Sequence, residues 1–380
     1  MDAKEIRRKI DEIDDKMSEL FCQRMELGAQ IGAWKRQQGL PVLNPGRERE
    51  VLAHVAERCG PELEGYSRVL YSTMLDVCRS YQHSLTDGNS PLADTIDATL
   101  AKAEERFPAR AVVACQGVEG AYSQLACEKL FKNPSIVYFH RFDDVFHAVA
   151  GGMCRYGILP IENSSAGSVT AVYDLMKEYN FHIVRSVRLR VSHCLLTKPG
   201  VTMGQIKEIA SHQQALSQCS RLLAAHPEIK VTVCENTAAA ARMVAESGRD
   251  DIAALSSRNC AELYGLKVLQ DHVQNNDSNY TRFICISSRP EIYPGADKIS
   301  LMVTLPHRPG SLYRLITRFA SLDLNLTKLE SRPIPGSDFE FRFYFDLEGW
   351  VGDPAVKALL SGLQDEMDEF VFLGNYTEVL

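Results

Sequence analysis

The sequence lacks the patterns that mark secreted and membrane proteins. None of its 11 cysteines forms a C-x-x-C pair, and an odd number of cysteines cannot all pair within one chain. No run approaches the roughly 20 apolar residues that a membrane-spanning helix needs. The first residues, MDAKEIRRKIDEIDD, carry too many charges for a signal peptide. The sequence therefore predicts a cytoplasmic protein with reduced thiols.

Motifs for common cofactors and metals are missing as well. The sequence contains no G-x-G-x-x-G motif of a dinucleotide site, and no His, Cys, Asp and Glu residues show the spacing of metal ligands. We therefore expect no cofactor and no metal. The formal net charge of −7 argues against a nucleic-acid-binding protein, and no membrane association is expected. An anionic ligand would need arginines and lysines gathered locally.

Composition divides the 380 residues into three regions. Residues 1–88 are charged with helical periodicity and predict an all-helical domain, followed by a linker over 89–109. Residues 110–290 alternate β-rich runs with helical patterns, which predicts an α/β domain. Residues 298–380 follow a βαββαβ order, which predicts a small α+β domain.

The first helix is predicted between a capping pattern, Asp2 with Glu5, and a stop at Gly39. Its apolar residues recur at spacings of three and four, as in a coiled-coil seam: Ile6, Ile10, Ile13, Met17, Leu20, Leu27, Ile31 and Trp34. Arg24 occupies the missing seam position, where a guanidinium needs a partner or a ligand. From Arg24 alone, a pairing with a Glu across the bundle and a ligand site are equally open.

More polar residues border the same predicted interior. They are Arg7 and Lys35 of the first helix, Arg47 and Glu48 at the start of the next, and Cys78 and Gln82 of a third. Such a set suits a small dianion. At 1.5 Å per residue, Arg7 lies about 25 Å along the helix from Arg24. Arg7 can therefore reach the same pocket only from a second subunit, which predicts a homodimer of intertwined helices or a higher homo-oligomer.

These residues carry a family resemblance over residues 1–85. The pattern I-R-R-K-I-D-x-I-D, Arg24, Lys35, N-P-G-R-E and C-R-S-Y-Q resembles the all-helical chorismate mutase family. The resemblance implies a pericyclic rearrangement of chorismate to prephenate. It implies that Arg24, with Arg7 of a second subunit, holds the two substrate carboxylates. Lys35 and Gln82 would donate to the ether oxygen, which gains negative charge as the C–O bond breaks.

The same resemblance assigns supporting roles around the second helix. Arg47 would support the pocket, and Glu48 would accept a hydrogen bond from the substrate hydroxyl. The sequence departs from the family at Asn44, where Asp is common, and at Cys78, where Ser is common. Cys78 is a weak donor, so its contact with a carboxylate would be weaker. The reaction needs no nucleophile, so a fixed conformer and well-placed donors suffice.

Polar residues cluster at the end of one central strand, in the run YGILPIENSSAG. Glu162, Asn163 and Ser164 fit either an N-cap cluster or a binding cleft at the carboxyl end of a strand. Ser211 and the adjacent His212 are not expected to form a nucleophile pair. The sequence has no G-x-S-x-G elbow, and neighbouring side chains rarely face each other.

The central region is similar to the prephenate dehydratase family over residues 110–290. The motifs are G-V-E-G-A-Y-S, P-I-E-N-S-S-A-G-S-V, S-H-Q-Q, L-Y-G-L and N-Y-T-R-F. The resemblance implies two α/β lobes, arranged as in type II periplasmic binding proteins, with the site between them. It implies conversion of prephenate to phenylpyruvate with loss of CO2 and water. Departures from the family are Val118, Ala121 and Gln213, and Ala121 removes a hydroxyl that could contact substrate.

The resemblance also assigns the central residues. Thr281, which alone would be an ordinary β-former, would hydrogen-bond the departing ring hydroxyl. Arg282 would lie near the substrate carboxylates, and Glu162 would orient the site. The remaining substrate contacts implied by the resemblance are Asn163, Ser164, Ser211 and Gln214.

The last region resembles an ACT regulatory domain of the dehydratase kind, on the motifs P-G-S-L and E-S-R-P. The residues alone favour a helix entry turn at Pro309 and Gly310. The resemblance implies pairing across subunits and an amino-acid effector, with L-phenylalanine expected. The implied effector residues are Gly310, Ser311, Leu312, Glu330, Ser331 and Arg332.

Together, the resemblances imply a bifunctional enzyme of phenylalanine biosynthesis that takes chorismate and prephenate as substrates. One alternative is a metabolite sensor without catalytic activity, in which the helices only dimerise. A second is a dehydratase with an inactive mutase domain, for which Asn44 and Cys78 are the hints. One assay on chorismate separates the three.

Overall fold

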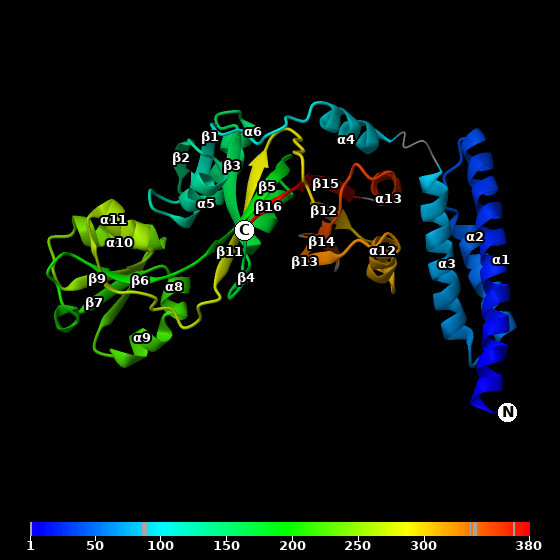
Figure 1. Ribbon diagram of the computed structural model, residues 1–380, viewed down its shortest axis with the longest axis horizontal. Helices are drawn as coiled ribbons and strands as arrows, with labels where there is room; N and C mark the ends of the chain where they lie inside the picture. Colours follow the sequence, from blue (N-terminus) through cyan, green and yellow to red (C-terminus); the bar gives the residue numbers. More distant parts are fainter. Residues whose placement is uncertain (1, 86–89, 335, 337–339, 368) are drawn as a thin grey trace. The chain divides into compact units, whose positions relative to one another are not determined.

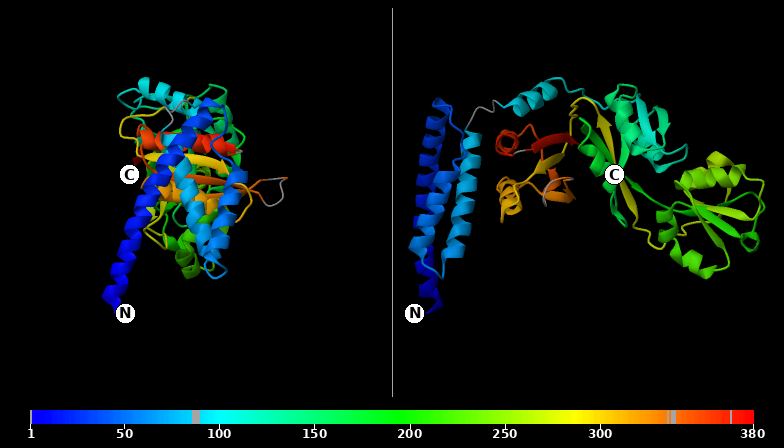
Figure 2. Two further views of the ribbon diagram at one scale, coloured as in Figure 1. Left: turned by 90° about the vertical axis from the view of Figure 1, so that its right-hand side faces the viewer. Right: turned by 180° about the vertical axis from the view of Figure 1, so that it is seen from behind.

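Two units make up the chain in the computed structural model, which describes residues 2–85, 90–334, 336, 340–367 and 369–380. One unit consists of Met1–Ala101 with Ile299–Phe372, and the other of Lys102–Lys298 with Leu373–Leu380. The predicted combination of an all-helical domain, a two-lobed α/β domain and a small α+β domain is confirmed. Figure 1 labels the elements, and Figure 2 gives two further views.

Three helices form the N-terminal part of the first unit: α1 (Ala3–Gln37), α2 (Pro45–Cys59) and α3 (Glu64–Ser84). Asp2 caps α1 by accepting from the Glu5 amide at 2.8 Å, and Asn44 caps α2 by accepting from the Arg47 amide at 3.1 Å. A Cβ built on Gly28 of α1 would lie 2.5 Å from the Cys78 sulfur of α3. The glycine therefore permits the close approach of these two helices.

The C-terminal part of the first unit follows the predicted βαββαβ order. Its elements are β12 (Lys298–Thr304), α12 (Ser311–Ala320), β13 (Leu326–Pro333), β14 (Phe341–Glu348), α13 (Pro354–Glu366) and β15 (Glu369–Tyr376). The sheet order is β13-β14-β12-β15, so β13 is an edge strand. Phe319 of α12 and Phe345 of β14 pack edge to face in the core, with ring centroids 5.5 Å apart.

The segment 89–109 contains more regular structure than the linker that the sequence predicts. Helix α4 (Pro91–Ala101) lies within it and buries Leu92 and Ile96. The Ser90 hydroxyl donates to the Ser361 hydroxyl of α13 at 2.8 Å. The turn-forming residues at the start of this segment obscured the short apolar helix that follows. Residues 86–89, which the sequence also marks as a boundary, lie outside the described residues.

The second unit contains two sheets. The larger has the order β2 (Ser135–Phe139), β1 (Val112–Gln116), β3 (Tyr156–Asn163), β11 (Tyr280–Ser287), β5 (His182–Arg190) and β16 (Glu378–Val379), with β4 (Gly167–Ser168) beside β3. Its helices are α5 (Tyr122–Leu130), α6 (Phe142–Ala150) and α7 (Thr170–Met176). Strand β11 is antiparallel to β3, with Thr281 opposite Asn163. This register brings together two motifs that lie far apart in the sequence.

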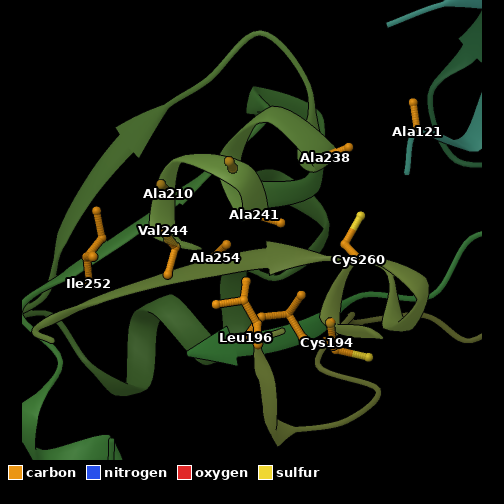
Figure 3. Close-up of a cluster of buried hydrophobic side chains, with 13 residues drawn as sticks. Ala121, Cys194, Leu196, Ala210, Ala238, Ala241, Val244, Ile252, Ala254 and Cys260 are labelled. Carbon is orange, nitrogen blue, oxygen red and sulfur yellow. The ribbon is translucent and has the colours of Figure 1, made fainter. Parts of the chain in front are cut away.

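The smaller sheet has the order β10 (Lys267–Gln270), β6 (Cys194–Thr197), β9 (Ile252–Ser256), β7 (Glu208–Ser211) and β8 (Lys230–Val233). Helices α10 (Thr237–Glu246) and α11 (Arg258–Tyr264) lie on one side of it, and α8 (Gln213–Gln218) and α9 (Ser220–Ala225) on the other (Figure 1). A 3-10 turn, η1 (Met203–Gln205), precedes β7. Figure 3 shows the core under α10, where Ala241 lies near Ala254 of β9. Small side chains there let the helix pack close to the sheet.

The end of the chain differs from the expected boundary of 298–380. Strand β16 pairs in parallel with β5 of the second unit, with Glu378 opposite Ser186. Gly374 has φ +152°, and a Cβ on it would lie 2.1 Å from the Ile183 carbonyl oxygen of β5. The missing side chain lets the two backbones meet at this point. The last residues thus complete the larger sheet of the central region.

Candidate active sites

A cavity of about 390 Å³ lies among the three N-terminal helices and is called the helical cavity here. The predicted residues that line it are Arg24, Lys35, Asn44, Arg47, Glu48, Cys78 and Gln82. Arg79, which the sequence did not single out, lines it as well. Among the described lining residues, four side chains are cationic and one is anionic. This excess of positive charge beside apolar residues such as Ile31 and Val51 suits a small dianion.

Three polar atoms of residues that line the helical cavity are buried without a hydrogen-bond partner among the described residues. They are Nη1 of Arg24, Nε of Arg79 and Oε1 of Gln82. Gln82 is 8% exposed, and its Nε2 lies 3.4 Å from the Cys78 sulfur. Because an unpaired buried polar group is costly, such atoms are typical of a ligand site. Lys35 donates from Nζ to the Val42 carbonyl oxygen, which fixes its position at the wall.

Arg79 connects the helical cavity to the C-terminal part of the same unit. Its guanidinium binds Glu48 and Asp76, and its Nε lies 3.8 Å from a carboxylate oxygen of Glu366 in α13. Burial disfavours the charge, but the carboxylates, Glu48 first, raise the pKa of Arg79 overall. Glu366 also accepts from Arg318 at 2.8 Å. Glu48 is therefore held by a protein cation, an interaction that the sequence did not predict.

Arg7 does not line the helical cavity of its own chain. It is exposed near the start of α1, as the length of the helix requires. The apolar seam of α1 is also exposed, with exposed fractions from 47% to 63% at Ile6, Ile10, Ile13, Met17, Leu20, Leu27, Ile31 and Trp34. The expected dimer stays a prediction, and these two observations are the physical reasons for it.

A second cavity of about 340 Å³, called the central cavity here, lies within the second unit. Asn163, Gln214 and Thr281 line it, as predicted, and so does Ala121. Thr281 and Phe283 lie two residues apart on β11, so their side chains point to the same face and both line the cavity. None of the described lining residues is Lys or Arg, and Glu235 is the anionic one among them. Apart from Glu235, the described lining of the central cavity therefore offers neutral hydrogen-bonding groups and apolar walls.

The contact between Asn163 and Thr281 forms the centre of the site. Asn163 donates from Nδ2 to Thr281 Oγ1 at 2.9 Å. Its Oδ1 accepts from the backbone amides of Ser165 at 3.0 Å and Ala166 at 2.9 Å. The turn after β3 thus fixes the orientation of this amide, because only its oxygen can accept from an N–H group.

Four other residues predicted for this site do not line the central cavity among the described residues: Glu162, Ser164, Ser211 and Arg282. Ser211 is fully buried and donates to the Leu255 carbonyl oxygen at 2.6 Å. Ser164 is exposed and donates to the Ser278 carbonyl oxygen at 3.1 Å. Arg282 points to the opposite face of β11, where it lies 3.5 Å from Glu378 and 4.0 Å from Glu162. For Arg282 the physical reason is strand alternation, because adjacent residues of β11 such as Thr281 and Arg282 point to opposite faces of the sheet.

Several residues that sequence reasoning missed line the central cavity. They are Gln116, Tyr122, Ser123, His193, His212, Gln218, Glu235 and Asn236. Tyr122, Ser123 and His212 lie within the quoted motifs G-V-E-G-A-Y-S and S-H-Q-Q, but none of them was assigned a role in the site. Burial lowers the pKa of both His193 and His212, so both favour the neutral form. His212 caps α8 by accepting from the Gln214 amide at 3.3 Å, so it does not pair with Ser211.

The predicted effector residues lie on two elements of the C-terminal part. Gly310, with φ 80°, precedes α12, and Ser311 and Leu312 open that helix. Glu330, Ser331 and Arg332 lie on the edge strand β13, opposite Tyr344, Phe343 and Arg342 of β14. The helix entry turn at Gly310 follows from its left-handed conformation, which favours glycine. The effector role of both groups stays a prediction.

The described residues contain neither a candidate metal site nor a candidate membrane-spanning helix. No cluster of three or more His, Cys, Asp or Glu side chains there is arranged to hold a metal ion. No helix in the same residues combines the length and the apolar character that crossing a membrane requires.

Comparison with known proteins finds two families that match different parts of the chain. The family described as Prephenate dehydratase matches residues 113–291, and that described as Chorismate mutase type II matches residues 6–83. Arogenate dehydratase/prephenate dehydratase 2, chloroplastic, of Arabidopsis thaliana is 36% identical over 279 residues, which cover 70% of this chain and 73% of the relative. The bifunctional chorismate mutase/prephenate dehydratase of Stutzerimonas stutzeri is 29% identical over 386 residues, covering 99% of this chain and 98% of the relative.

A solved structure is also similar. The prephenate dehydratase from Arthrobacter aurescens, in complex with L-Phe, has a TM-score of 0.64 and 30% sequence identity. The match covers 70% of this chain and 89% of that chain.

Proposed function

This chain belongs to the prephenate dehydratase family and carries a chorismate mutase domain of type II, and we propose that its two cavities perform these two reactions in turn. Chorismate would rearrange to prephenate in the helical cavity. Prephenate would then lose CO2 and water in the central cavity to give phenylpyruvate. Neither step calls for a cofactor, and we expect the enzyme to act in the cytoplasm. The charged lining of the helical cavity, with its unpaired Arg24 nitrogen, is the observation that carries the mutase assignment.

The mutase step depends on donors aimed at charge that develops during the reaction. Arg24 would bind a substrate carboxylate, with Arg7 of a second subunit on the other. Lys35 and Gln82 would stabilise the ether oxygen as the C–O bond breaks. Gln82 supports this role because it is buried and its side-chain amide has only a weak sulfur contact among the described interactions. Such preorganised donors typically contribute 100- to 1,000-fold each to kcat.

The remaining predicted residues of the helical cavity have supporting roles in this proposal. The Asn44 oxygen caps α2, so the Asp-to-Asn departure leaves a helix cap in place. Arg47 forms an exposed ion pair with Glu50 at 3.0 Å, which fits a supporting position at the rim. Glu48 would accept from the substrate hydroxyl while Arg79 holds it. Neither departure, at Asn44 or at Cys78, removes a charged group that the reaction needs.

The dehydratase step would use the neutral character of the central cavity. A carboxylate that enters a cavity without Lys or Arg is poorly solvated, which favours its loss as CO2. The electron pair left behind forms a ring double bond, and the ring hydroxyl departs. Thr281 would donate a hydrogen bond to that departing oxygen, with Asn163 and Gln214 as further contacts. Aromatisation of the ring supplies much of the driving force.

Feedback by L-phenylalanine is the regulatory part of the proposal. The similar dehydratase from Arthrobacter aurescens was solved with L-Phe, which supports the same class of effector here. The amino acid would bind where the start of α12 meets Glu330, Ser331 and Arg332 of a second subunit. Edge strand β13 offers an open side for such pairing. Inhibition would then be a coupling free energy between that interface and the catalytic cavities.

Paired substitutions test the assignment of one reaction to each cavity. Arg24→Ala should abolish conversion of chorismate while leaving turnover of prephenate nearly intact, and Thr281→Ala should do the reverse. Each activity is the folding control for the other. Equal damage to both activities by both variants would refute the two-cavity assignment. A chain that binds chorismate or prephenate without turnover would be a sensor, and one that turns over only prephenate would have an inactive mutase domain.

A further inference from the structure

Three amide side chains, two of them buried, connect Thr281 to a histidine in the central cavity. Besides Thr281, Asn163 donates from Nδ2 to the Asn279 oxygen Oδ1 at 2.9 Å. Asn279 in turn donates from Nδ2 to Gln218 Oε1 at 3.0 Å. The same Gln218 oxygen lies 2.9 Å from Nε2 of His193. Asn163, Asn279 and His193 are 6%, 1% and 2% exposed, so solvent contributes little to holding them.

The backbone sets the direction of every hydrogen bond in this series. The Asn163 oxygen is taken by the amides of Ser165 and Ala166, so its nitrogen must face Thr281 and Asn279. Asn279 must then present its oxygen to Asn163 and its nitrogen to Gln218. The Gln218 oxygen thereby accepts from Asn279, and His193 can meet it only as an Nε2–H donor.

The direction of the series also decides where the Thr281 proton lies. A hydroxyl has one proton and accepts through its lone pairs. Because Thr281 Oγ1 accepts from Asn163, its own proton points away from Asn163. Thr281 lines the central cavity, so the proton is available to an oxygen bound there. A reversed Asn163 amide would instead attract that proton and remove the donor.

His193 is suited to end such a series. Its backbone amide donates to Gln274 Oε1 at 2.9 Å, which ties the residue to the loop before β11. Its Nδ1 is buried without a hydrogen-bond partner among the described residues, so a proton there would have no acceptor. Burial also lowers the pKa of His193, which favours the neutral ring. The single N–H group is thus kept on Nε2, facing Gln218.

We propose that His193 is a positioning residue, which acts through Gln218, Asn279 and Asn163 to hold Thr281 as a hydrogen-bond donor. The proposal rests on the role given above to Thr281 in the dehydratase reaction. His193 needs no contact with the reacting atoms for this role. Its loss should mainly lower kcat, since the donor that it aligns acts in the transition state.

Two substitutions of similar size separate a positioning role from simple packing. Gln at 193 can place an amide N–H near the former Nε2, whereas Met fills the space without a donor. With prephenate as substrate, His193→Met should lower kcat about 10- to 100-fold with KM changed less than about 3-fold. His193→Gln should retain at least about a third of the wild-type kcat. A packing role predicts equal effects of the two variants, and that result would overturn the proposal.

A double variant distinguishes failure of this inference from failure of the Thr281 assignment. In a Thr281→Ala background, His193→Met should cause no further loss of kcat, because the aligned hydroxyl is already gone. Losses that multiply would overturn the role of His193 alone. If Thr281→Ala by itself keeps normal turnover of prephenate, the proposed function of Thr281 fails first. Chorismate turnover by each preparation reports whether the rest of the chain is folded.

A spectroscopic readout covers the case in which His193→Met does not fold. Nitrogen NMR of the imidazole ring in the wild-type protein at pH 7 should show the neutral form with the proton on Nε2. His193→Gln identifies the signal by its disappearance. A proton on Nδ1, or a doubly protonated ring, would overturn the proposal.

Discussion

The close contact between Gly28 and Cys78 gives a sharp test of how the helical cavity is built. An alanine at position 28 would bring its Cβ to 2.5 Å from the Cys78 sulfur, about 1–1.5 Å closer than an ordinary contact of about 3.5–4 Å. Helix propensity alone would favour Gly28→Ala by about 1 kcal/mol, but overpacking typically costs about 1–3 kcal/mol. Cys78 must therefore move, and Gln82, whose Nε2 lies 3.4 Å from that sulfur, moves with it.

The expected consequence is a loss of mutase activity that exceeds the loss of stability. A displacement of about 1 Å in a catalytic donor can lower a rate about 100-fold, so we expect mutase kcat/KM to fall about 10- to 100-fold. Chorismate consumption measures the effect, and prephenate turnover by the same preparation should stay near the wild-type rate.

A matched control and a second substitution complete this test. Gly65→Ala in α3 has no atom within 4 Å of its new Cβ, so it should leave mutase activity unchanged. Gly28→Ala combined with Cys78→Ala removes the obstructing sulfur and should recover part of the activity, as coupled neighbours do. If Gly28→Ala alone has full mutase activity, the packing of α1 against Cys78 and Gln82 is not the one described.

Two further predictions concern assembly and acidity. Ile13 on α1 is 55% exposed and should be covered in the dimer. Ile13→Glu should therefore yield monomers, measured by light scattering, and should abolish mutase activity while sparing dehydratase activity. Arg8→Glu, which changes an exposed ion pair with Glu12, is the control. An unchanged mass would contradict the dimer. Burial lowers the pKa of His182 in the folded protein. As the pH falls below about 6.5, this histidine is therefore protonated in the unfolded chain before it is protonated in the folded one. The free energy of unfolding then drops by at most about 1.4 kcal/mol per pH unit. Acid denaturation of His182→Gln should therefore show a shallower slope between pH 6.5 and 5; an identical slope would exclude His182 as a contributor.

The helical cavity was predictable because its residues follow a helical period. Seam spacing placed Arg24 and Lys35 on one face of α1, and an i,i+4 spacing placed Cys78 and Gln82 on one face of α3. The spacing along one helix fixes which side chains share a face, and this does not depend on how the rest of the chain folds. Arg79 escaped notice because its partners Glu48 and Glu366 come from other helices, and sequence spacing carries no information about such contacts.

The central cavity was predicted less completely because strands and loops from distant parts of the chain build it. The motif resemblance found Asn163, Gln214 and Thr281. It misplaced Arg282, although the period of two along β11 already separates Arg282 from Thr281. His193 had no sequence signal of its own. Asn279 begins the N-Y-T-R-F motif but was given no role, because only the pairing of β11 with β3 brings it beside Asn163.

Under the assignment proposed above, the two cavities would meet anionic substrates by opposite means, and an acidic chain could then serve both reactions. The described lining of the helical cavity has four cations, which would suit a reaction that moves charge onto an ether oxygen and keeps both carboxylates. Apart from Glu235, the described lining of the central cavity has neutral hydrogen-bonding groups and apolar walls, which would suit a reaction that expels a carboxylate as CO2. A lysine placed beside that carboxylate would stabilise the ground state and slow its departure. In this proposal, the absence of Lys and Arg from the described lining would matter to the dehydratase reaction as much as Thr281 does.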